Sequence, residues 1–233
     1  ATSAASVPGL SRSHADSRAG AAARAVASNQ AAGGNEDLAR RHYETGLAFL
    51  RDGRYQEALK DFQAVADNYP SSTVADQALL QIATYHFEQA HDPARAASMI
   101  DQLLRVYPTG RAAPFAYLLS GRVALSAVPR SPRAGDAATG GTAGGAPSGT
   151  GAPRSPQLDA ALASFARARR LFPVPEVMAA AGYYSGEALR TSGRCTDALD
   201  AYQDVITDYP RLAWAARAEL GLGRCLVTLD RAR

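Results

Sequence analysis

Residues 42–70 read HYETGLAFLRDGRYQEALKDFQAVADNYP, and this segment contains two helical patterns. Gly53 separates the patterns, as expected of a tight turn, and Pro70 closes the second one, because proline cannot continue a helix. Each pattern combines small residues, suited to the crossing point of two helices, with large residues beside them. The small residues are Gly46 and Ala58, and the large ones are Phe49, Tyr55 and Phe62. The segment therefore predicts one helix-turn-helix unit.

Three sets of residues recur along the chain in one register. The closing dipeptide is found at Tyr69-Pro70, Tyr107-Pro108, Phe172-Pro173 and Tyr209-Pro210, so the prolines are 38, 65 and 37 residues apart. The same spacings separate a small residue in each second helix and a large residue four positions later: Ala58, Ala96, Ala161 and Ala198, followed by Phe62, Ile100, Phe165 and Tyr202. The longest step equals one repeat plus an insertion of about 27 residues. A repeat explains this register, whereas a non-repetitive helical bundle would need coincidence in all three sets.

These sets resemble the tetratricopeptide repeat family, whose 34-residue unit has a small residue in each helix and a closing proline. The small position of the first helix is held by Gly46, Thr84, Gly121, Gly186 and Gly223. The tryptophan position of the family is not kept: His42, Leu80, Tyr117, Gly182 and Glu219 stand there. The period is also about four residues longer. Both departures, with the lead from Tyr69 to Ala75, resemble the bacterial cell-envelope branch that includes BamD and CpoB.

The resemblance covers residues 38–229 and implies an all-α fold, a right-handed α-α superhelix of about four and a half repeats and nine helices. Neighbouring helix pairs would share one core, because no pair can bury its apolar stripe alone. Ser71, Ser72 or Thr73 is expected to cap the third helix. The last helix would cap the array or, alternatively, leave an apolar face for a missing helix. The expected helices are Leu38–Arg51, Tyr55–Asn68, Ser72–Glu88, Pro93–Val106, Ala112–Ser126, Leu158–Leu171, Glu176–Thr191, Cys195–Thr207 and Leu212–Leu229.

Composition divides the chain into one folded domain at 36–233, a flexible Ala- and Ser-rich tail at 1–35, and a Gly-, Ala- and Pro-rich insertion at 127–157. The insertion has few apolar side chains and is expected to be disordered; the alternative is a partner-binding or wall-spanning loop. No apolar run approaches the ~20 residues that cross a bilayer, and the tail lacks the apolar centre of a signal peptide. Residue 1 is Ala rather than the lipidated Cys of a mature lipoprotein, so a lipid anchor is expected only if its segment was lost.

The net charge of +3 is small, and its cationic residues are almost all Arg spread along the chain, with Lys60 as the only lysine. This distribution does not indicate a nucleic-acid partner, which usually requires a clustered basic surface.

The two cysteines flank a predicted turn. Cys195 begins a second-type helix and Cys225 lies late in the next helix, with Pro210 midway between them. Two antiparallel helices folded about that turn would place the thiols side by side, which predicts a disulfide and an oxidising compartment such as the periplasm. The alternative is two buried free thiols in a cytosolic core. Zinc is not expected, because two cysteines without nearby histidines make a poor ligand set.

No combination of residues indicates catalysis. His42 occupies a large-residue position and is expected to pack in the core, while His86 and His91 do not have the spacing of a His-x3-His metal-ligand pair. Gly-x-Ser-x-Gly, His-Glu-x-x-His and a phosphate-binding loop are all missing from the sequence. We therefore expect a non-enzymatic protein without a metal or a cofactor.

The family resemblance implies a binding surface on the first-type helices, which line the concave face of such arrays. The hypothesis is a groove for a peptide or a helix of a protein partner, since Tyr and Arg are enriched at binding hot spots and Arg can hold a carboxylate through two hydrogen bonds. The alternative is that these are ordinary solvated side chains. The matching positions are Tyr43, Arg51, Tyr85, Glu88, Arg122, Tyr183, Glu187, Arg190, Arg217 and Arg224.

The resemblance further implies a protein–protein interaction scaffold, an adaptor in the periplasm that serves outer-membrane or division-related assembly of the bacterial cell envelope. Two alternatives remain open. One is an accessory structural subunit docked on a larger membrane complex, with the tail as its attachment arm. The other is a regulatory module of a longer signalling protein.

Overall fold

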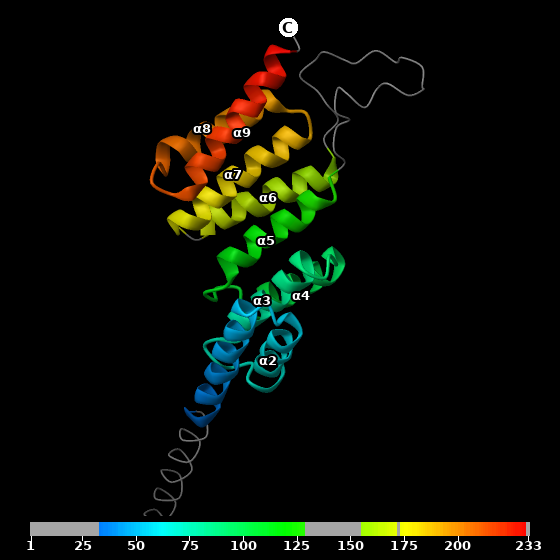
Figure 1. Ribbon diagram of the computed structural model, residues 1–233, viewed down its shortest axis with the longest axis vertical. Helices are drawn as coiled ribbons and strands as arrows, with labels where there is room; N and C mark the ends of the chain where they lie inside the picture. The colour runs from blue at the N-terminus through cyan, green and yellow to red at the C-terminus, as the bar shows by residue number, and fades with distance from the viewer. Residues whose placement is uncertain (1–32, 129–154, 172, 232–233) are drawn as a thin grey trace, which may run out of the picture. The chain divides into compact units, whose positions relative to one another are not determined.

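The computed structural model describes residues 33–128, 155–171 and 173–231, and every regular element in these ranges is an α-helix (Figure 1). The first helix is described over residues 33–51. It is followed by α2 (Tyr55–Asn68), α3 (Ala75–Glu88), α4 (Pro93–Val106), α5 (Ala113–Ser126), α6 (Pro156–Leu171), α7 (Pro175–Thr191), α8 (Cys195–Asp208) and α9 (Ala213–Asp230). The predicted all-α fold and the order of its helices are confirmed. Residues 1–32 of the predicted tail and 129–154 of the predicted insertion lie outside the described residues.

The helix boundaries differ from the predicted ones by a few residues. The first helix already includes residue 33, which the sequence places in the tail. Helix α3 begins at Ala75 rather than Ser72, because residues 70–74 form turns. Within these turns the Thr73 hydroxyl donates to the Glu36 carboxylate, and the Ser72 hydroxyl is buried with no partner among the described residues. Neither of these two hydroxyl groups therefore forms the helix cap that the sequence predicted.

The repeat residues do set the turns and the helix ends. A left-handed backbone conformation, which glycine adopts without steric cost, stands two residues before α2 and α8. It also recurs before α4, at a residue other than glycine. These positions are Gly53 (φ 73°), Gly193 (φ 81°) and His91 (φ 51°). The tyrosines of the Tyr-Pro dipeptides end α2, α4 and α8, each bonding its N–H to a carbonyl four residues earlier: Tyr69 to Val65, Tyr107 to Leu103 and Tyr209 to Val205.

The described chain divides into two compact units, one that ends at Ala75 and one that begins at Asp76. In the first unit, the buried Phe62 ring of α2 packs on Gly46 and lies 5.7 Å, centroid to centroid, from Tyr43. His42 does not enter this core as predicted. Its side chain is 41% exposed, and its Nδ1 lies 2.8 Å from Oδ1 of Asp61. The histidine therefore links the two helices by a polar contact at their edge.

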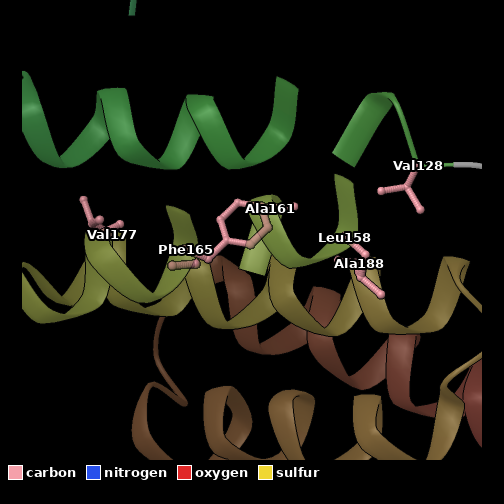
Figure 2. Packing of buried hydrophobic residues seen from close by; sticks show 8 residues of the cluster. Val128, Leu158, Ala161, Phe165, Val177 and Ala188 are labelled. Atoms are coloured by element: carbon pink, nitrogen blue, oxygen red, sulfur yellow. The ribbon is translucent and has the colours of Figure 1, made fainter. Parts of the chain in front are cut away.

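In the second unit, each helix from α4 to α9 packs on the next one in the chain, and α7 additionally contacts both α5 and α9 (Figure 1). The first-type helices α5, α7 and α9 therefore form one layer, with α6 and α8 packed on it. Buried apolar side chains fill the space between the layers. One such cluster, which includes Val128, Leu158, Phe165 and Val177, lies among α5, α6 and α7 (Figure 2). A second cluster joins α7, α8 and α9.

Glycine on a first-type helix makes room for a ring of the next second-type helix. A Cβ atom at Gly46 would lie 2.7 Å from Cε1 of Phe62, and one at Gly186 would lie 2.5 Å from Cε1 of Tyr202. Gly121 faces the ring of Phe165 in the same way. The small residues of the second helices are uniformly buried, with at most 1% exposure at Ala58, Ala96, Ala161 and Ala198. The predicted pairing of small and large positions is confirmed at all three glycines.

Core residues stand on both sides of the main part of the predicted insertion in the sequence. Val128 and Leu158 flank residues 129–154 on either side, and both are buried in the same cluster (Figure 2). Helices α5 and α6 also pack directly on each other, with the hydroxyl oxygens of Ser120 and Ser164 3.4 Å apart. The described residues of the two helices therefore pack on each other through both apolar and hydroxyl side chains.

Candidate protein-interaction surface

Arginine and aromatic side chains from α5, α7 and α9 form one connected surface cluster. We call it the Arg–aromatic belt and define it as Arg122, Tyr183, Tyr184, Trp214 and Arg217. Arg122 Cζ lies 5.4 Å from the ring centroid of Tyr184, whose ring is 5.6 Å from that of Trp214. The Tyr183 ring lies 5.5 Å from that of Trp214, and Arg217 Cζ is 4.5 Å from the Trp214 centroid. The belt therefore crosses all three first-type helices of the layer.

The belt combines exposure with rigidity. Its three aromatic residues are half-buried, and Arg217 is exposed. Guanidinium groups are attracted to aromatic faces, so each end of the belt carries a cation stacked on a ring. Large aromatic groups lose little conformational entropy when they bind, and together with arginine they dominate binding hot spots. The arrangement is suited to holding another protein rather than to chemistry.

Hydrogen bonds fix the belt in place. Arg122 Nη2 donates to Oε1 of Glu88 on α3 at 2.9 Å, and Trp214 Nε1 donates to Oε1 of Glu176 on α7 at 2.9 Å. Burial, with the nearby charge of Glu187, raises the pKa of Tyr183, so its hydroxyl stays protonated and can donate a hydrogen bond. A surface ordered in this way would have less side-chain entropy to lose if it bound another molecule.

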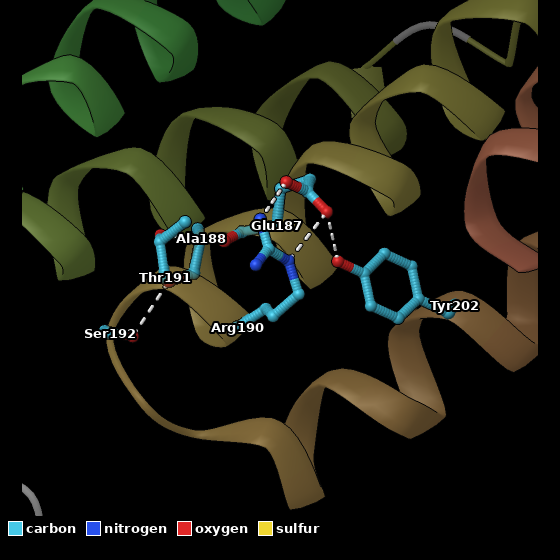
Figure 3. A network of polar contacts seen from close by, with 6 residues as sticks. All are labelled: Glu187, Ala188, Arg190, Thr191, Ser192 and Tyr202. Carbon is cyan, nitrogen blue, oxygen red and sulfur yellow. Dashed lines mark hydrogen bonds and ion pairs between the residues drawn. The ribbon is translucent and has the colours of Figure 1, made fainter. Parts of the chain in front are cut away.

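Glu187, predicted together with Arg190 to lie in the groove, accepts hydrogen bonds from both Arg190 and Tyr202 (Figure 3). Arg190 donates from Nη2 to Oε2 of Glu187 at 2.7 Å, and Tyr202 Oη donates to Oε1 at 2.6 Å. Burial alone would raise the pKa of Glu187, but the bonds from Arg190 and Tyr202 outweigh it and leave that pKa below its usual value. Burial and the carboxylate raise the pKa of Tyr202. The network ties α7 to α8.

The other predicted groove residues fall into three groups. Arg122 and Glu88 pair with each other, and Tyr183 and Arg217 meet through Trp214. Arg224 is exposed on α9, and its charge contributes to the low pKa of Glu187. Tyr85 lies half-buried on α3, while Tyr43 and Arg51 belong to the first unit. The binding role of these residues stays a prediction.

Cys195 and Cys225 are both buried and are free thiols in the structure. Burial, together with a hydrogen bond from the Cys225 thiol to Cys195, raises the pKa of Cys225 to about 12. The two side chains are therefore neighbours across α8 and α9. The disulfide between them stays a prediction.

The described residues contain neither a metal-ligand cluster nor a membrane-spanning helix. No group of three or more His, Cys, Asp or Glu side chains in this part of the chain is arranged to hold a metal ion. None of the described helices has the length and apolar character needed to cross a membrane.

The stacked helix pairs and their aromatic surface define a tetratricopeptide-like scaffold. A model of the YfiO family, described as outer membrane lipoprotein, matches residues 35–224, and the chain belongs to this family. Among solved structures, the crystal structure of MamA protein is similar with a TM-score of 0.51 and 16% identity, over 84% of this chain and 90% of that one. A second MamA structure has a TM-score of 0.49 and 15% identity, over 80% and 95% of the two chains. A comparison with curated protein sequences finds no match.

Proposed function

We propose that the chain is a non-enzymatic adaptor of the bacterial cell envelope, active in the periplasm, that binds another protein through the Arg–aromatic belt. Membership of an outer membrane lipoprotein family supports the location. The observation that carries the proposal is the connected series of rings and guanidinium groups over α5, α7 and α9.

The belt also favours a type of partner. Arg122 is already paired with Glu88, whereas Arg217 stacks on Trp214 and makes no ion pair with any described residue. An acidic side chain of the partner would find its best position at Arg217, where a carboxylate can accept two hydrogen bonds from one guanidinium. The rings of Tyr184 and Trp214 would contact an apolar side chain next to it. We therefore expect a partner segment that combines an acidic residue with neighbouring apolar ones.

Capture of partners from a cell-envelope extract tests the proposal. The chain would be compared with Arg217→Glu and Trp214→Ala, and with two matched controls, Arg105→Glu on α4 and Arg170→Glu on α6, which are exposed on second-type helices. A hot-spot change of this kind is expected to reduce recovery of a bound protein at least about tenfold. The controls are expected to leave it unchanged.

Circular dichroism would first establish that all four variants keep the helical content of the parent chain. Equal recovery with the two belt variants and the two controls would refute the belt as the binding surface. A loss with the control variants alone would move the surface to the second-type helices.

A further inference from the structure

His86 on α3 is an exception to the repeat. Its side chain is only 9% exposed, and its Nδ1 atom is buried with no hydrogen-bond partner among the described residues. A buried polar atom without a partner destabilises a fold, so its presence requires an explanation. The repeat itself does not supply one, because the other first-type helices have apolar residues two positions after their small residue: Ala48, Val123, Ala188 and Cys225.

Asp76, another buried polar side chain of α3, is fully paired. It is 6% exposed, and its two carboxylate oxygens accept hydrogen bonds from the backbone N–H groups of Gln77 at 2.8 Å and Ala112 at 2.9 Å. The His86 imidazole instead lies against a ring, 5.5 Å from that of Tyr85. The surroundings of His86 are therefore suited to a neutral aromatic group and offer nothing that would stabilise a charged one.

The charged groups near His86 also favour its neutral form. Burial lowers the pKa of His86, Arg95 on α4 lowers it further, and Asp92 opposes both to a smaller extent. The Asp92 carboxylate is already engaged, because it accepts from the Arg95 N–H at 2.9 Å and lies 3.6 Å from Arg95 Nε. At the end of α3, Glu88 is paired with Arg122 of α5. A proton on His86 would therefore place a buried cation near Arg95, and both nearby carboxylates are already paired.

The turn that follows His86 has a strained backbone. Two residues before α4, His91 has a φ of 51°, in the left-handed region where Gly53 and Gly193 stand before α2 and α8. Glycine adopts this conformation freely, whereas a residue with a side chain does so at a cost. The turn is bonded to His86 itself, since the Asp92 N–H donates to the His86 carbonyl at 2.8 Å. We therefore expect local opening of the chain to include this turn.

The two residues after His86 hold one end of the Arg–aromatic belt. The Glu88 carboxylate accepts from Arg122 Nη2 at 2.9 Å, and the centroid of the Phe87 ring lies 5.2 Å from Arg122 Cζ. Arg122 Cζ in turn lies 5.4 Å from the ring centroid of Tyr184. The position of Arg122 therefore depends on the last turn of α3, which contains His86.

We propose that His86 is an acid-sensitive switch, whose protonation loosens the last turn of α3 and releases Arg122 from Phe87 and Glu88. Thermodynamic linkage gives the direction of the effect. The opened turn exposes His86 to water and binds its proton more tightly than the closed turn, in which the pKa is lowered. The closed turn therefore has its full stability above the ordinary histidine pKa of about 6.5 and loses stability as the pH falls below that value.

The switch would regulate the belt. Acid would weaken any binding that depends on an ordered Arg122, and this consequence alone rests on the proposed function. The opening of the turn and the release of Arg122 are properties of the chain itself, so both can be measured without a partner.

Hydrogen exchange measured by mass spectrometry on the full chain tests the opening. Peptides covering residues 85–92 would be followed between pH 7.5 and 5, with protection calculated relative to the unfolded chain. Their protection is expected to fall by up to about tenfold per pH unit below about pH 6.5. His86→Phe and His86→Gln cannot titrate and are both expected to lose this pH dependence, so the test survives if one of them fails to fold. Peptides of α8, which contains no histidine, are the internal control.

His91→Gly is the matched control variant in the same segment. It removes the left-handed strain but keeps His86, so it is expected to raise protection at every pH and to retain the pH dependence. NMR of the Arg122 side chain tests the release. Its Nε–H signal, assigned by its loss in Arg122→Lys, is expected to shift towards the position of mobile arginines between pH 7.5 and 5.5 in the parent chain and to stay in place in His86→Phe.

Three outcomes would overturn the proposal. The first is protection that falls with pH equally in the parent chain and in His86→Phe. The second is an Arg122 signal that stays in place over this pH range in the parent chain. The third is a pH dependence that only His91→Gly abolishes, because His91 would then be the titrating group. A belt that captures no partner would refute the proposed function and would leave these measurements unaffected.

Discussion

The junction of α7 with α8 and the outward face of α9 present the same register in two states. At the junction, Gly186 receives the ring of Tyr202 and the helices share a buried cluster. On α9, Gly223 faces no described residue, and apolar side chains lie exposed around it. A glycine at a repeat position is therefore explained by the side chain that packs against it from the next helix, and not by the helix that contains it. Changes to residues at the junction and on the outward face of α9 are expected to alter this contrast.

Removing the ring at the junction would make it resemble the α9 face. Tyr202 is fully buried between Gly186 and Gly221, which have no side chains to fill the space it leaves. Tyr202→Ala is therefore expected to lower the free energy of unfolding by about 3–5 kcal/mol, measured by urea denaturation. Phe115→Ala, at an aromatic residue that is 42% exposed on α5, is the matched control and is expected to change it by less than about 1 kcal/mol. Equal losses would contradict the assigned role of the ring.

A disulfide bond between Cys195 and Cys225 would join α8 to α9 covalently and stabilise the packed side of α9. It would close a loop of about 30 residues and contribute roughly 3–4 kcal/mol in the chain-entropy model. We predict that the oxidised chain unfolds at higher denaturant than the reduced one. Mass measurement after alkylation without reduction tests the bond, and two labelled thiols in protein from an oxidising compartment would exclude it. The raised pKa of Cys225 predicts that the reduced, folded protein alkylates slowly at pH 7.

The two glycines are expected to respond to alanine with opposite signs. Gly186→Ala places a methyl group against the Tyr202 ring and is expected to destabilise by about 1–3 kcal/mol through overpacking. Gly223→Ala meets no described atom apart from its chain neighbours and its own helix backbone, and it is expected to stabilise by up to about 1 kcal/mol through helix propensity. Denaturation of the two variants in parallel measures both effects. Destabilisation by Gly223→Ala would mean that the α9 face is already covered in the protein.

The Glu187 network occurs at the junction of α7 with α8 and not on the outward face of α9. It makes the stability of the junction depend on pH. The pKa of Glu187 is lowered in the folded state, so its contribution is complete above its unfolded pKa and is lost as the pH falls through the lower folded value. At pH 7, Glu187→Gln is expected to cost about 1–2 kcal/mol, because the bonds from Arg190 and Tyr202 lose their charged acceptor. The gap between the variant and the parent chain should narrow below about pH 4. A gap that does not change with pH would argue against an ionised Glu187.

The pairing of the helices was predictable from the sequence because it follows from the repeat. The same residue types recur at a constant offset, and contacts such as Gly186 with Tyr202 and Gly121 with Phe165 follow from it. The helix ends were less predictable. Ser72 has the chemistry of a cap, yet residues 70–74 form turns in which Thr73 bonds to Glu36, 37 residues away. No local pattern reports a contact at that distance.

The candidate surface was only partly predictable for a related reason. A position on a helix indicates which way a side chain points, but not which groups lie opposite. Glu187 and Arg190 were therefore predicted as groove residues, without the hydrogen bond that Glu187 accepts from Tyr202 of the next helix. Tyr184 and Trp214 were missed because the family's groove positions do not include them. The presence of the single tryptophan of the chain at the start of a first-type helix was a usable signal.

Val128 and Leu158 are buried in the same core cluster, so the segment between them is a natural place to divide the molecule. A chain severed between residues 129 and 154 would yield two polypeptides whose matching faces, on α5 and α6, still recognise each other. Such halves could be produced separately and recombined. A reporter domain spliced into the same place would leave both the belt and the outward face of α9 unaltered, which offers a way to follow the protein in living cells.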